Sequence, residues 1–242
     1  MAHGGRGMIL NRREYLAGSA AMAASLHGTV AAMPAVLAPA PVLPARHDFA
    51  ATDIAYLDNG SQHPVSLGAR AAIDRYLQKR MLVPGSESHT IDDEALLAKF
   101  ARLVGADPAE VTFVQSTTTG EQMVLRALGL PQAGGHIVTD TLHFFGSIPL
   151  YEEMARQGCE VTWLRPVDGR IRIEDIRRAV GKGTRLVALS LVSTVNGFEH
   201  DLKAVCDIAH AAGALVYADI IHAAGCVPVD LHASGVDFAA CA

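Results

Sequence analysis

Apolar and polar stretches alternate along residues 54–242 in a way that predicts strands and helices in turn. Short runs rich in β-branched and apolar residues predict strands at 111–115, 136–139, 161–164, 186–192, 215–219 and 235–241. Between these runs, apolar residues recur at helical spacing and predict helices that begin at Gly120, Ile173 and Lys203, with another through Leu150. Such alternation is typical of a three-layer α/β fold, in which helices cover a mostly parallel sheet. Because the run at 235–241 meets the end of the chain, we expect the sheet to be incomplete.

Two more helices are predicted before the first strand. Ser66–Arg80 carries apolar residues at helical spacing, and Pro84-Gly85 is expected to break the chain after it. Thr90, three residues before Asp93, predicts the cap of the second helix, and Gly105 is expected to end that helix.

The first 45 residues differ in composition from the rest of the chain. The paired arginines Arg12-Arg13 precede an aromatic residue, a leucine and a weakly apolar run, which is typical of a twin-arginine export signal. His27 and neighbouring Gly and Ser residues interrupt the run well short of the roughly 18 apolar residues that a membrane span needs. A disordered alanine-rich tail is the alternative. We expect residues 1–45 to be a signal with a Pro/Ala-rich linker, and the protein to be exported to the periplasm without a membrane anchor after signal removal.

Composition excludes several classes of function. Half of the 242 residues are apolar and 19% are charged, which suits one large α/β domain, here 46–242. A net charge of −5 with scattered basic residues argues against a nucleic-acid partner. The cysteines are widely spaced, which predicts buried free thiols, and the histidines match no standard metal site. The chain also lacks the sequence motifs of serine hydrolases, dinucleotide-binding domains, ATPases and zinc proteases.

Two predicted strands are followed by polar residues that could carry chemistry. The strand at 215–219 is apolar until Asp219, and ligands bind at the carboxyl ends of such strands, although an Asp there can also simply form a turn. Ser116–Gly120 lies between a predicted strand and a helix, where hydroxyls and free N–H groups favour an anion. An ordinary N-cap is the alternative for this loop.

The segment that contains Asp219, His222 and Pro228-Val229-Asp230 resembles the class V aminotransferase and cysteine desulfurase superfamily, which comprises fold-type I pyridoxal-phosphate enzymes. The resemblance covers roughly 54–242 and implies that this part of the chain is a PLP-dependent transferase large domain. It implies that Asp219 keeps the pyridine nitrogen of pyridoxal 5′-phosphate protonated, so that the ring can accept electrons. His222 would reach the ring's phenolic oxygen or the Schiff base.

The same resemblance assigns further cofactor contacts. Thr117 and Thr118 would hold the cofactor phosphate, and His143 would stack on the pyridine ring, where a neutral imidazole can also move protons. From the residues alone, His143 is equally compatible with a surface loop. Thr194 stands where the family usually has an Asn that bonds the ring hydroxyl, and Asn196 is the other candidate for that bond.

One expected residue is missing. In the family, the segment corresponding to Gly235–Phe238 continues to the lysine that forms the Schiff base, and by register that lysine would lie three residues beyond Ala242. None of the chain's lysines lies in that context: Lys79, Lys99, Lys182 and Lys203. The chain therefore resembles the truncated front part of an enzyme.

The resemblance implies that the full-length parent is a PLP-dependent enzyme acting on a small amino-acid substrate. Its reaction would be that of an aminotransferase, a cysteine desulfurase or lyase, or an isopenicillin N epimerase-like enzyme, and a homodimer is the implied assembly. The alternative is a non-catalytic truncated remnant, because without the lysine amine the usual covalent link to the cofactor cannot form. We expect the 242-residue chain itself to be inactive.

Overall fold

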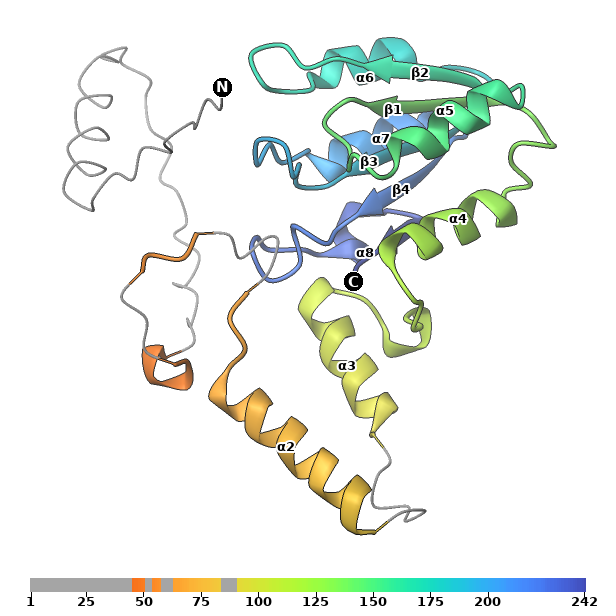
Figure 1. Ribbon diagram of the computed structural model, residues 1–242. Helices are drawn as coiled ribbons and strands as arrows, with labels where there is room; N and C mark the ends of the chain where they lie inside the picture. The colour runs from red at the N-terminus through yellow and green to blue at the C-terminus, as the bar shows by residue number, and fades with distance from the viewer. Residues whose placement is uncertain (1–44, 51–53, 58–62, 84–90) are drawn as a thin grey trace, which may run out of the picture. The chain divides into compact units, whose positions relative to one another are not determined.

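Residues 136–240 contain a five-stranded parallel sheet with the strand order β2-β1-β3-β4-β5 (Figure 1). The computed structural model describes residues 45–50, 54–57, 63–83 and 91–242. The strands are β1 His136–Asp140, β2 Glu160–Leu164, β3 Thr184–Ser190, β4 Leu215–Asp219 and β5 Phe238–Ala240. These five strands confirm the predicted parallel sheet, each within a few residues of its expected position.

Helices cover both faces of the sheet, which confirms the three-layer α/β architecture. They are α4 Thr117–Ala127, α5 Ile148–Arg156, α6 Ile173–Ala179, α7 Leu202–Ala211 and the short α8 Leu231–Ser234. The α4 helix begins three residues before the predicted start at Gly120. Figure 1 shows α4 and α5 on one side of the sheet and α7 on the other.

Alternate residues of the strands feed two separate hydrophobic cores. Val138, Val187 and Val216 pack with α6 and α7, whereas Ile137 and Leu186 pack with α4 and α5. This period of two is the geometry of a pleated strand, whose successive side chains point to opposite faces. Burial of each large aliphatic side chain contributes about 1.5–3 kcal/mol, so both layers of helices are held to the sheet.

Two helices precede the sheet, α2 Leu67–Leu82 and α3 Asp93–Val104. The predicted helix 66–80 is confirmed by α2, which Ser66 caps by accepting the Ala69 N–H. The predicted cap of α3 is wrong: Asp92 accepts the Ala95 N–H, and Thr90 lies outside the described residues, as does the predicted break at 84–85.

Gly105 ends α3, as predicted, because it adopts a left-handed conformation with φ 65°. A Cβ at this position would lie 2.7 Å from Oδ1 of Asp230, so the close approach of the loop before α8 also requires glycine. Both the φ angle and the packing therefore select glycine here.

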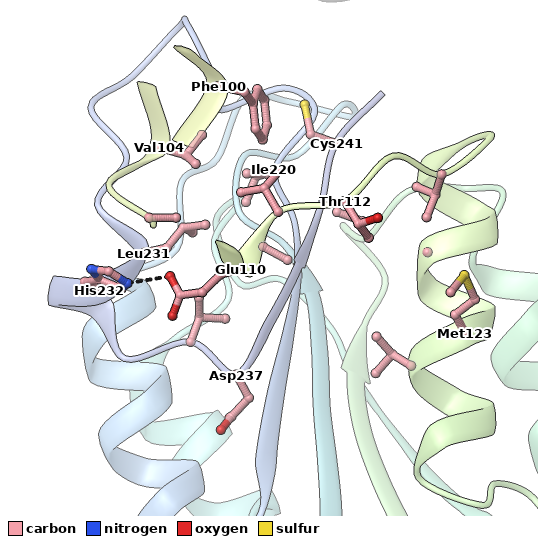
Figure 2. Close-up of a pocket in the computed structure, with 18 residues that line it drawn as sticks. Phe100, Val104, Glu110, Thr112, Met123, Ile220, Leu231, His232, Asp237 and Cys241 are labelled. Atoms are coloured by element: carbon pink, nitrogen blue, oxygen red, sulfur yellow. Dashed lines mark hydrogen bonds and ion pairs between the residues drawn. The ribbon is translucent and has the colours of Figure 1, made fainter. Parts of the chain in front are cut away.

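The predicted strand at 111–115 is wrong. The segment follows the 3-10 helix η3 Pro108–Glu110 and is extended at Val111, but it pairs with no strand in the described part of the chain. A cavity of about 340 Å³ is lined both by this segment, through Val111, Thr112 and Val114, and by Ala239, Ala240 and Cys241 at the end of the chain (Figure 2). An apolar run favours an extended backbone, but a strand also needs a hydrogen-bonded neighbour.

Of the predicted signal and linker at 1–45, residues 1–44 lie outside the described residues. Within them, none of the helices is long and apolar enough to cross a membrane.

Candidate functional site

The carboxyl ends of β3 and β4 bring Ser190 and Asp219 side by side, as paired positions of adjacent strands. Asp219 is buried, and its Oδ1 accepts the Ile221 N–H at 3.0 Å. Burial raises the pKa of Asp219, while the Ile221 N–H and the nearby His143 and His222 act in the opposite direction. A cationic ligand group placed against this carboxylate would stabilise its charge, because the carboxylate is buried and has one backbone donor.

Ser116 forms the N-cap of α4, as the alternative for this loop predicted, and the hydroxyl of Thr117 beside it stays without a partner. Ser116 caps α4 by accepting the Thr119 N–H at 3.1 Å. Thr117 is buried at the first helical position, yet its Oγ1 has no hydrogen-bond partner, and Thr118 beside it is partly buried. A helix N-terminus with unused N–H groups and a free hydroxyl fits an anionic group such as a phosphate.

His143 is 1% exposed, so the surface-loop alternative is wrong. It follows β1 in a turn in which the Asp140 carboxylate accepts the Leu142 N–H at 2.8 Å. Its Nδ1 accepts the Phe144 N–H at 2.8 Å and lies 2.9 Å from Ser190 Oγ. The ring is thereby anchored to the end of β3.

Glu121, which the sequence interpretation missed, lies beside His143 in the same cluster. Its carboxylate is 1% exposed and accepts hydrogen bonds of 2.7 Å from Ser147 Oγ and from Tyr151 OH. His143 Nε2 lies 3.3 Å from Glu121 Oε1, in ion-pair range but short of hydrogen-bond geometry. Burial pushes the pKa of Glu121 upward, but the His143, Ser147 and Tyr151 contacts outweigh it and lower that pKa below its ordinary value.

A signal for Glu121 was present in the sequence. It lies four residues after Thr117 and four before Leu125, both of which are buried, and so occupies the inward face of α4. A charged residue on the buried stripe of an amphipathic helix requires partners, because an unpaired buried charge is strongly unfavourable.

The remaining predicted contacts are spread more widely. His222 is partly buried in the loop after β4, close enough to Asp219 to influence its pKa. Thr194 is exposed in the loop between β3 and α7. Asn196 donates to Gly169 O at 2.7 Å and accepts the Phe198 N–H, which is the behaviour of a turn residue.

The cysteine prediction is partly wrong. Cys159 and Cys206 are buried free thiols as predicted, but Cys226 is exposed and Cys241 only partly buried. Cys226 lies in the turn-rich loop after β4, where the backbone runs over the surface. Burial raises the pKa of Cys159 and Cys241, and raises that of Cys206 to about 12, so these groups remain thiols at neutral pH.

Buried polar atoms without partners cluster around this site. They include Thr117 Oγ1, His143 Nε2 and the hydroxyl of Tyr217, whose pKa burial raises and the charges of Glu121 and Asp219 raise further. An unsatisfied buried polar group costs about 1–3 kcal/mol, so such a group indicates a place for a polar ligand or water. Together with the buried Asp219 carboxylate, these atoms fit a ligand that carries an anionic group at one end and a protonated nitrogen at the other.

The chain is similar to known proteins in sequence. The family model for aminotransferase class-V matches residues 56–242. Cysteine desulfurase IscS of Shewanella loihica is 28% identical over 193 residues, which is 75% of this chain and 48% of that protein. Kynureninase of Pseudomonas fluorescens is 33% identical over 207 residues, which is 81% of this chain and 49% of that protein. The chain thus spans about half the length of these curated relatives.

Solved structures share the fold. A NifS-like protein superposes with a TM-score of 0.65 at 19% identity, over 76% of this chain and 53% of that one. The cysteine desulfurase CsdA of Escherichia coli gives a TM-score of 0.57 at 23% identity, over 77% of this chain and 44% of that one.

Proposed function

Because the chain belongs to the class-V aminotransferase family, whose members depend on pyridoxal 5′-phosphate, we propose that the full-length protein is a PLP-dependent enzyme acting on an amino acid. The observation that carries the proposal is the buried carboxylate of Asp219 at the end of β4, close enough to the buried ring of His143 for His143 to affect its pKa. The free hydroxyl of Thr117 at the start of α4 supports it.

Each residue has a distinct role in this proposal. Thr117 and Thr118 bind the phosphate with their hydroxyls and with the first N–H groups of α4. Asp219 holds a proton on the pyridine nitrogen, and His143 packs its ring against the cofactor. When bound, the cofactor supplies an electron sink for substrate carbanions. His222, in the loop after β4, stays the candidate for the ring's phenolic oxygen or the Schiff base, and Thr194 stays the candidate for the ring hydroxyl.

The names of the relatives favour a reaction on an amino acid such as cysteine or kynurenine, and we propose a lyase of this kind ahead of an aminotransferase or epimerase. A desulfurase reaction needs a nucleophilic thiolate. Among the chain's cysteines, Cys159, Cys206 and Cys241 have raised pKa values and are poor nucleophiles, and the exposed Cys226 lies outside the cluster.

A second candidate is a non-catalytic cofactor binder, and the lysines of the chain favour it. Lys79, Lys99, Lys182 and Lys203 are all exposed, and Lys203 is engaged by Asp207 at 2.7 Å. To carry the cofactor covalently, a lysine must place its side-chain amine at the site. The two candidates differ in whether the rest of the gene product supplies that amine.

Titration with pyridoxal 5′-phosphate tests the proposal. The protein produced from the complete gene should develop a protein-bound cofactor absorbance, and Asp219→Asn should weaken binding by about tenfold or more, because hydrogen bonds to charged groups are worth about 1.5–3 kcal/mol. Asp168→Asn is the matched control, since the Asp168 side chain is 93% exposed. A complete protein that binds no cofactor would overturn the enzyme proposal, and binding without turnover of any amino acid would favour the second candidate.

A further inference from the structure

Glu121 has no role in the proposed cofactor contacts, yet it is among the most deeply buried charged groups of the described chain. It lies on α4, four residues after Thr117, and it contacts residues from two other segments: His143 after β1, and Ser147 and Tyr151 at α5. We propose that Glu121 is a positioning residue that fixes the tautomer and orientation of His143 and ties it to the start of α4. The relevance of this positioning to catalysis rests on the proposed function.

The hydrogen bonds of His143 determine where its ring proton lies. A backbone N–H can only donate, and the shorter of the two contacts of the Phe144 N–H, 2.8 Å to Nδ1 against 3.1 Å to Ser190 Oγ, selects Nδ1 as an acceptor. Ser190 Oγ, 2.9 Å from the same nitrogen, also lies 3.1 Å from the Phe144 N–H and completes this side of the ring. The proton of the neutral imidazole therefore lies on Nε2.

On the opposite side of the ring, Nε2 faces the carboxylate. Its distance to Glu121 Oε1 is 3.3 Å, and the ionised carboxylate can only accept, so the negative charge of Glu121 favours a proton on Nε2 although the contact lacks hydrogen-bond geometry. The lowered pKa of Glu121 keeps the carboxylate charged at neutral pH. Tyr151 donates to the same Oε1 at 2.7 Å and competes with His143 for it, which explains why the Nε2 contact falls short of hydrogen-bond geometry.

This arrangement restricts what His143 can do. Both ring nitrogens are turned toward protein groups, so the ring can offer a ligand only its face unless the Glu121 or Phe144 contact is broken. Any proton that leaves Nε2 has Glu121 as its nearest acceptor. Glu121 also ties the His143 ring to α4, the helix that begins at Thr117.

Nitrogen-15 NMR of the cofactor-free full chain, labelled at histidine, tests the tautomer directly. The His143 signal is assigned by its disappearance in His143→Gln. We expect the ring proton to lie on Nε2, and the resonance of this proton to be shifted downfield and protected from exchange with water. In Glu121→Gln the carboxylate charge is removed with little change in shape, so the resonance should move upfield and exchange with water about tenfold faster or more. Glu152→Gln on α5, an exposed carboxylate, is the control and should leave the resonance unchanged.

Tyr151→Phe gives an independent variant if Glu121→Gln does not fold. It removes the competing donor to Oε1, so the His143 resonance should move further downfield. A proton found on Nδ1 in the wild-type chain would overturn the proposal, as would an unchanged resonance in both variants. Because these spectra need no cofactor, failure of cofactor binding would leave them interpretable and would count only against the proposed function.

Discussion

At the scale of single residues, two carboxylates in one cluster have opposite environments. Glu121 receives side-chain hydrogen bonds from Ser147 and Tyr151 and its pKa is lowered, whereas Asp219 has one backbone donor and its pKa is raised by burial. Titratable groups whose environments separate their pKa values are typical of functional sites. The cluster therefore holds one carboxylate that is already satisfied and one that lacks a counter-charge.

Asp219→Asn should stabilise the cofactor-free chain at neutral pH while it weakens cofactor binding. A carboxylate whose folded pKa is raised disfavours the folded state at any pH above its unfolded pKa, because its charge is less stable when buried. The asparagine keeps the acceptor for the Ile221 N–H and removes the charge. Thermal unfolding at pH 7 should show a higher Tm than wild type, with Asp168→Asn as the control. A lower Tm would show that the Asp219 charge is already compensated.

The pair of Glu110 and His232 gives a pH-dependent prediction at the rim of the cavity in Figure 2. Their 2.7 Å hydrogen bond raises the pKa of His232, while the Asp107 N–H and His232 lower that of Glu110. The His232 contribution to stability is complete below its unfolded pKa and is lost as pH rises through the folded one. The Glu110 contribution is present above its unfolded pKa and is lost as pH falls through its folded one.

Glu110→Gln should therefore lower the pKa of His232, measured by its NMR titration. Glu160→Gln, which removes an exposed carboxylate at the start of β2, should leave that titration unchanged. An identical His232 titration in Glu110→Gln would show that the hydrogen bond does not form in solution.

At the scale of elements, the strands carry the stability and α2 contributes little burial. Ile137 on β1 is fully buried against α4 and α5, whereas Ile73 on α2 is 51% exposed and α2 has no buried residue. The same substitution at the two positions should therefore have very different effects.

Ile137→Ala should lower the free energy of unfolding by about 2–5 kcal/mol, because it removes buried methylene groups and leaves a cavity. Ile73→Ala should change it by less than about 0.5 kcal/mol, as is usual at exposed positions. Urea denaturation of both variants measures the difference. Equal losses would mean that α2 is buried in solution.

The elements also show how far the sequence could predict the fold and the site. β1, β3 and β4 were predictable because their burial on both faces gives continuous apolar runs. The segment 111–115 has a similar pattern but no paired strand, and pairing is not a local property of the sequence. Asp219 was predictable from its position at the end of an apolar run, whereas Thr117 was named through the family resemblance, because the helix was expected to begin at Gly120. The tautomer of His143 was not, because it depends on the Phe144 backbone and on Glu121, 22 positions away.

At the scale of the whole molecule, we propose that the protein is exported through the twin-arginine pathway. The support is the Arg12-Arg13 pair before a weakly apolar run, and these residues lie outside the described part of the chain. The pathway carries folded proteins, which suits an enzyme that binds its cofactor before export.

Replacing both Arg12 and Arg13 with Lys should leave the precursor inside the cell, because the pathway recognises the arginine pair. Fractionation of cells that express the wild-type and substituted proteins measures this. The control is Arg6→Lys, which lies outside the pair and should be exported normally. Periplasmic recovery of the doubly substituted protein would refute the proposal.

The all-parallel order β2-β1-β3-β4-β5 has a consequence for the kinetics of folding. Parallel neighbours cannot be joined by a hairpin, so every pairing must wait for a helical crossover, and the β1–β3 contact between His136 and Thr184 closes a loop of 48 residues. Loop-closure entropy is then lost before non-local contacts stabilise the chain, which makes such sheets slow to fold. In the sheet, β2 lies on one side of β1, and β3, β4 and β5 follow on the other side in the order in which the ribosome makes them. The sheet can therefore grow outward during synthesis, with each new strand finding a finished edge.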